Sequence, residues 1–123
     1  MEIHEYPYYG LGMIAYSIAL SDGKIQVSER NELRSIVRDW SRDIECDFDV
    51  SEIIFSVMNR TPVDSEWGYE HGIKYIKQGS EFVDEKLKEK FLYLINDIAH
   101  AFPPVTTSER TVLERFEADL KNL

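Results

Sequence analysis

Apolar residues in this chain recur every three or four positions, and this spacing restricts the fold more than any other feature of the sequence. It places the apolar side chains of a segment on one face of an α-helix. No segment shows the apolar–polar alternation that is typical of a β-strand. The sequence therefore predicts an all-α fold, a bundle of about six helices. The apolar stripes cover residues 11–19, 33–44, 50–58, 67–76, 83–102 and 112–123.

Turn and cap residues separate these stripes. The Asp22-Gly23 pair is expected to end the first helix, because glycine tolerates the left-handed backbone that often closes a helix. Asp49 and Thr106 are each followed three residues later by a glutamate, which is the pattern of a capping box at a helix N-terminus. The third and sixth helices are therefore expected to begin at these two caps.

Two glycines, Gly68 and Gly72, interrupt the fourth predicted helix, which is expected over residues 64–78. Glycine weakens a helix, so its presence needs a reason. We interpret the pair as a place where a neighbouring helix packs closely.

Length and charge restrict the class of protein. The 123 residues suit a single domain, predicted over 1–123, and no linker or low-complexity run divides them. The net charge of -9 argues against binding to nucleic acid or anionic lipid and favours cations and basic partners. No apolar run reaches the length of a membrane span, and the N-terminus lacks the layout of a signal peptide. Membrane insertion is therefore not expected, and the predicted location is cytoplasmic.

An internal repeat relates residues 11–40 to residues 91–120. Each unit contains a helix, a short loop with one aliphatic residue, and a second helix that opens with the same Ser-Glu-Arg triplet. The units are predicted to form two similar helix–loop–helix hairpins related by a pseudo-twofold axis. The residues expected in one shared core are Ile18, Ile25, Leu33, Ile98, Val105, Leu113 and Phe116.

The order of these motifs is that of a known family. An apolar helix runs into Asp22-Gly23 within residues 18–25, Glu29 follows the glycine by six positions, and a second, altered copy covers residues 98–109. Over nearly its whole length the chain resembles the TerB-like (tellurite resistance) family. The resemblance implies an all-helical, non-enzymatic interaction module with protein partners. It also implies a place in a bacterial assembly that responds to tellurite or other chemical stress and associates peripherally with the membrane.

The resemblance also implies a divalent-metal role for acidic residues near the two loops, which are Asp22, Glu29 and Glu109 here. Phe102 and Pro103 replace Asp-Gly in the second loop, so one carboxylate is missing. A weakly bound divalent cation is the cofactor implied, and a divalent-cation sensor is the alternative function. The residues themselves leave a structural explanation open, because a glutamate at the third helical position caps a helix and aspartate is common in turns.

No set of catalytic residues stands out, and the chain is not expected to be an enzyme. It has no Ser-His-Asp order, glycine-rich phosphate loop or arguable pair of catalytic carboxylates. Cys46, the only cysteine, can form neither an intrachain disulfide nor a multi-cysteine zinc site, and its acidic neighbours disfavour the thiolate. His4, His71 and His100 lack the spacing of zinc ligands.

Four tyrosines crowd the N-terminal part of the chain. The favoured interpretation is that they pack the first helix against its neighbours. The alternative is an exposed aromatic patch that binds another protein. These residues are Tyr6, Tyr8, Tyr9 and Tyr16.

Overall fold

The computed structural model describes residues 2–19, 27–44, 46, 48–58, 64–101 and 105–123. These residues form six α-helices and two short 3-10 turns, and no strand occurs among them. The predicted all-α bundle is therefore confirmed. The elements are η1 (Ile3–Glu5), α1 (Tyr6–Ala19), α2 (Val27–Ser41), α3 (Val50–Met58), α4 (Ser65–Gln78), η2 (Ser80–Phe82), α5 (Glu85–Ala101) and α6 (Thr107–Lys121).

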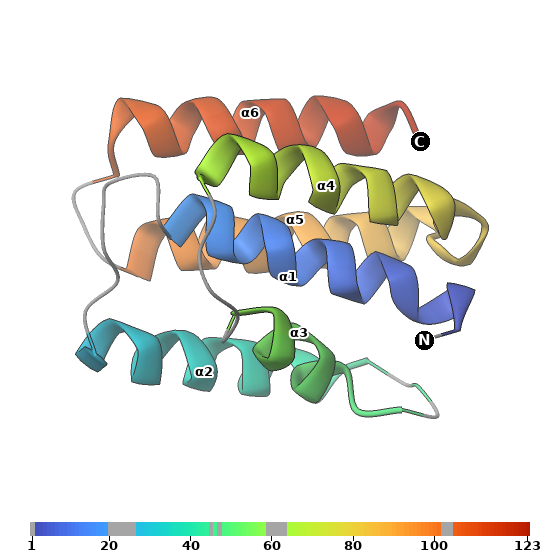
Figure 1. The fold of residues 1–123 in the computed structure, drawn as a ribbon, viewed down its shortest axis with the longest axis horizontal. Helices are drawn as coiled ribbons and strands as arrows, with labels where there is room; N and C mark the ends of the chain where they lie inside the picture. Colours follow the sequence, from blue (N-terminus) through green and yellow to red (C-terminus); the bar gives the residue numbers. More distant parts are fainter. Residues whose placement is uncertain (1, 20–26, 45, 47, 59–63, 102–104) are drawn as a thin grey trace.

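The six helices pack as two layers of three (Figure 1). In one layer α1 lies between α4 and α3, and in the other α5 lies between α6 and α2. The layers meet where α1 packs on α5 and where α3 packs on α2. The two central helices, α1 and α5, are the helices that open the two sequence units of the predicted repeat. The repeat itself and the single-domain assignment stay predictions.

The core lies between the two layers and contains most of the residues expected there. Ile18 and Leu33 come from the first sequence unit, and Ile98 and Phe116 come from the second; all four are buried in one cluster. Leu113 is partly buried and packs against that cluster. Val105 is also only partly buried, because it precedes the cap of α6 at the end of the bundle. Ile25 lies outside the described residues.

Helix boundaries follow the caps more closely than the apolar stripes. Asp49, Asp64 and Thr106 each accept a hydrogen bond from the backbone N–H three residues later, as expected of N-caps. The fifth helix was expected from Val83, but that residue has an extended backbone and α5 begins only at Glu85. The reason is a further cap, since the Asp84 carboxylate accepts from the Leu87 N–H at 2.8 Å.

Glycine allows α1 and α4 to approach closely. A Cβ atom on Gly72 would lie 2.7 Å from Ile14 Cγ1 and 2.8 Å from the carbonyl oxygen of Gly10, distances that real side chains do not adopt. The prediction of close packing is confirmed at this position. At Gly68 the nearest atoms would lie at 3.6 Å, which is ordinary contact. Of the two glycines, Gly72 is therefore the one that the crossing requires.

Three of the four N-terminal tyrosines pack as the favoured interpretation predicts, and the fourth, Tyr16, is half-buried. Tyr6 and Tyr9 place their rings 5.4 and 4.7 Å from the ring of Tyr75 on α4. Tyr8 is buried, and its ring lies 5.6 Å from that of Phe91 on α5. The start of α1 is thus held against both α4 and α5.

No helix in the described part of the chain is both long enough and apolar enough to cross a membrane.

Candidate functional site

The outer face of α5 carries the most exposed large hydrophobic side chain of the described residues. Tyr93 leaves 68% of its surface exposed. Its neighbours at 91, 94 and 95 are fully buried, so Tyr93 points away from the core. A groove runs along each side of this tyrosine, one toward α2 and one toward α6.

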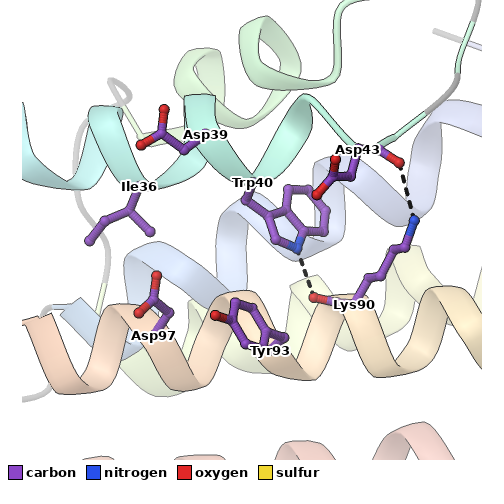
Figure 2. A pocket seen from close by; sticks show the side chains of 7 residues that line it. All are labelled: Ile36, Asp39, Trp40, Asp43, Lys90, Tyr93 and Asp97. Carbon is purple, nitrogen blue, oxygen red and sulfur yellow. Dashed lines mark hydrogen bonds between the residues drawn. The ribbon is translucent and has the colours of Figure 1, made fainter.

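The groove between α2 and α5 has a volume of about 350 Å³ (Figure 2). Its walls are joined by two hydrogen bonds. The Trp40 indole N–H donates to the carbonyl oxygen of Lys90 at 2.9 Å, and the Lys90 ammonium donates to the carbonyl oxygen of Asp43 at 3.1 Å. These bonds fix the indole and the lysine in place. The lining residues are Ile36, Asp39, Trp40, Asp43, Lys90, Tyr93 and Asp97.

The groove between α5 and α6 has a similar volume of about 370 Å³ and a simpler composition. Leu92 and Leu113 supply apolar surface, and both also pack against the core. The polar lining residues are three glutamates and one asparagine, with no basic side chain among them. The residues are Glu89, Leu92, Tyr93, Asn96, Leu113, Glu114 and Glu117.

The two grooves together form an acidic face. Asp39 pairs with Arg42 at 3.4 Å, but both side chains are largely exposed. Across the described residues, no ion pair joins Asp97, Glu89 or Glu114 to a base. A net negative potential is expected over this face, in keeping with the net charge of -9. We call the surface formed by the two grooves and Tyr93 the Tyr93 face.

The residues that the sequence suggested for metal lie elsewhere. Asp22 is outside the described residues. Glu29 belongs to the first turn of α2, and its side chain is outside the described part. Glu109 is only 6% exposed, and its carboxylate accepts from the backbone N–H and the hydroxyl of Thr106, each at 3.3 Å. The capping box predicted for α6 is thus confirmed.

The described residues contain no group of three His, Cys, Asp or Glu side chains placed to hold one metal ion. His100 is exposed, and its Nδ1 lies 2.8 Å from the carbonyl oxygen of Asn96 one turn earlier. His71 has the same kind of contact with Trp67, at 2.9 Å. These two histidines thus interact with their own helices.

Cys46 is exposed, and its thiol lies 3.6 Å from the hydroxyl of Tyr8. Burial raises the pKa of Tyr8 well above the ordinary value for tyrosine, and the contact with Cys46 adds to this effect. The phenol therefore stays protonated in the physiological range. In this neutral form the Tyr8 hydroxyl accepts a hydrogen bond from the Cys46 thiol.

The sequence does not predict the Tyr93 face, although it carries one signal. Tyr93 lies off the apolar stripe of its helix, between buried positions 91 and 94, so an exposed aromatic residue could have been expected there. The grooves beside it could not have been expected, because one joins α2 to α5, which are distant in the sequence, and the other depends on how α6 packs beside α5.

No protein-family model, curated protein or solved structure matches this chain. The described residues form a small all-α bundle with a grooved, acidic face.

Proposed function

We propose that the chain is a non-enzymatic, TerB-like interaction module that binds a protein partner through the Tyr93 face. The single observation that carries this proposal is the 68% exposure of Tyr93 between two grooves. Exposed aromatic residues are enriched in protein interfaces, where they supply much of the binding energy at a small cost in conformational entropy.

The surroundings of Tyr93 have the composition of an interface. Apolar surface from Leu92, Leu113 and Ile36 lies close to the tyrosine, and carboxylates surround it. An apolar centre with a polar rim is the usual layout of a protein-binding patch. The hydrogen bonds made by Trp40 and Lys90 hold one groove in shape before any partner arrives, which lowers the entropic cost of binding.

The motif order around Asp22-Gly23 and Glu29 supports the TerB-like part of the proposal. On this basis the partner belongs to a bacterial assembly that responds to tellurite or other chemical stress. The chain would contribute binding rather than chemistry, and any link to the membrane would be made through its partners.

Site-specific photo-crosslinking in the native host tests the proposal. A photoreactive amino acid at position 93 is compared with the same amino acid at position 67. Trp67 is a matched control, because it is also an exposed aromatic residue, stacks on His71 at 3.7 Å between ring centroids, and lines neither groove. We expect a discrete crosslinked product at position 93 that is absent at position 67. Equal products at both positions, or none at position 93 with and without tellurite stress, would contradict the proposal.

A further inference from the structure

We infer that the partner segment bound by the Tyr93 face is a basic amphipathic helix. This inference rests on the proposed function and names the chemistry of the partner. Its apolar side would lie in the groove between α5 and α6, and its lysine or arginine side chains would contact the carboxylates of both grooves.

The shape of the α5–α6 groove fits a helix. The α5 residues that line it stand at positions 89, 92, 93 and 96, which is the pattern i, i+3, i+4 and i+7, so they form one row along a face of the helix. The row spans about two turns, or roughly 10 Å. Leu92 on α5 and Leu113 on α6 supply apolar surface from the two walls of this groove. A groove of this length with a leucine on each wall can receive residues at i, i+3, i+4 and i+7 of an amphipathic helix.

Charge decides which helix can bind. Glu89, Glu114 and Glu117 line the α5–α6 groove, and none of its lining residues is basic. Only Glu117 among them forms an ion pair in the described part of the chain, an exposed contact of 3.6 Å with Lys121. An acidic partner, or a second copy of this face, would bring like charges together as water is excluded. A basic partner gains attraction at each of these positions.

The second groove adds a site for one long cationic side chain. Tyr93 and Trp40 supply aromatic surface, and Asp39 and Asp97 supply carboxylates (Figure 2). The one basic residue of this lining, Lys90, donates to the carbonyl oxygen of Asp43 at 3.1 Å. An arginine or lysine over an aromatic ring beside a carboxylate gains cation–π and Coulomb attraction together. Because Tyr93 borders both grooves, one bound helix reaches the second groove across this tyrosine.

Titration calorimetry with designed peptides tests this inference on the full chain. The probe is a helix of about 18 residues with a leucine stripe flanked by lysines. One comparison peptide carries glutamate at every lysine position, and the other has the same composition as the probe in a scrambled order. We expect binding of the basic helix only, and weaker binding as salt concentration rises.

Paired variants show whether the peptide binds at the Tyr93 face. Glu89→Gln with Glu114→Gln is expected to weaken binding about tenfold. Glu52→Gln with Glu70→Gln removes the same charge from exposed sites on α3 and α4, and is expected to leave binding nearly unchanged. Helical circular dichroism shows that each variant is folded.

Three outcomes would overturn the inference: no binding of the basic helix, equal binding of the scrambled or acidic peptide, or equal losses in the two double variants. Complete displacement of the peptide by spermidine at matched positive charge would also overturn it in favour of a small organic cation. The crosslink at position 93 separates this inference from the proposed function. A crosslinked partner whose mapped segment is not a basic helix refutes the inference alone, whereas the absence of any specific crosslink refutes the proposed function.

Discussion

Glu109 shows how one carboxylate can satisfy a helix terminus. Its backbone N–H donates to the Thr106 hydroxyl at 3.2 Å, while its carboxylate accepts from the backbone N–H and the hydroxyl of the same residue. The carboxylate also lies near the positive end of the helix dipole of α6, which favours its charge. The capping box therefore places this acid at the start of α6.

Replacement of Glu109 by alanine is expected to lower the free energy of unfolding by about 0.5–2 kcal/mol, because the reciprocal cap is lost. Glu109→Gln is the matched control, since an amide oxygen can still accept from Thr106, and its loss should be smaller. Urea denaturation of both variants measures the difference. Equal losses in the two variants would mean that the charge, rather than the cap geometry, stabilises this end of α6.

Metal affinity is expected to be weak or absent, with any dissociation constant on the order of 10⁻⁴ to 10⁻³ M. A hard cation needs several converging oxygens, yet Phe102 and Pro103 stand where a second Asp-Gly pair would be needed, and Glu109 is already engaged with Thr106. Calorimetric titration of calcium, magnesium and manganese measures this. Micromolar affinity that disappears in Asp22→Ala or Glu29→Ala would instead favour the cation-sensor alternative.

A second polar residue, Tyr69, links α4 to α6 from within the core. Its side chain is 1% exposed, and its hydroxyl donates to the Asp119 carboxylate at 2.6 Å. The Arg115 guanidinium lies 4.1 Å from the centre of the tyrosine ring and also donates to Glu66 at 2.7 and 2.9 Å. Burial, together with the bond to Asp119, raises the pKa of Tyr69 well above its ordinary value.

Tyr69→Phe is expected to cost about 1.5–3 kcal/mol of stability near neutral pH, because a hydrogen bond to a charged group is lost. A raised folded-state pKa stabilises the protein below the unfolded pKa of about 10 and ceases to do so as pH rises through the folded value. The difference between wild type and Tyr69→Phe should therefore shrink above pH ~10. Urea midpoints measured from neutral to alkaline pH test this, with exposed Tyr93→Phe as a control that should match wild type.

At the scale of elements, the crossing of α1 and α4 is the most extensive contact between helices in the described part of the bundle. Gly10 and Gly72 face each other there, and the backbone of one helix touches the other without intervening side chains. The N-terminal end of α1 also packs closely on Gly79, where an added Cβ would meet the ring of Pro7. The position of α4 thus depends on glycines, which leave room for its neighbours, as much as on apolar side chains.

Gly72→Ala is expected to destabilise the protein by about 1–3 kcal/mol, because the added methyl group overlaps Ile14 and the backbone of Gly10. Gly68→Ala in the same helix is the matched control. Its Cβ finds room, and alanine is the better helix former by about 1 kcal/mol, so its stability should equal or exceed that of wild type. Thermal unfolding of the two variants and the wild type measures these differences in stability. A Gly72→Ala protein as stable as wild type would disprove the close crossing.

At the scale of the whole molecule, both layers contribute to one core. Ile18 on α1 and Ile98 on α5 are 1% and 2% exposed and belong to the same buried cluster. Leu33 on α2 and Phe116 on α6 complete that cluster from the outer helices. Loss of packing in one layer should therefore weaken the other.

Ile18→Ala and Ile98→Ala are each expected to cost about 2–5 kcal/mol, through lost apolar burial and the cavity that remains. Unfolding by urea, followed by tryptophan fluorescence and circular dichroism, should give coincident transitions in both variants. If either variant unfolds at the wild-type midpoint, the two layers do not share the core described above.

The sequence by itself determined what depends on neighbours a few residues away. The spacing of apolar residues indicated where the helices lie, and the caps at Asp49 and Thr106 indicated where two of them begin. The glycine pair in the fourth helix indicated the crossing at Gly72. These features act within one or two turns, so they are visible without the fold. The late start of α5 shows where such local patterns fail. Val83 continues the apolar stripe and is buried, but the helix begins only after the cap at Asp84.

Only the tertiary structure decided which helices pack together and which surfaces stay open. An apolar stripe indicates that a helix is buried without naming its neighbour, and the stripe of α2 packs chiefly against α5 and α3 rather than against the helix that precedes it. The exposure of Tyr93 and the two grooves follow from this packing of the helices. One groove brings Trp40 beside Lys90, and the other is lined by both Leu92 and Leu113. Contacts of this kind arise from the packing of whole helices, which no local pattern specifies.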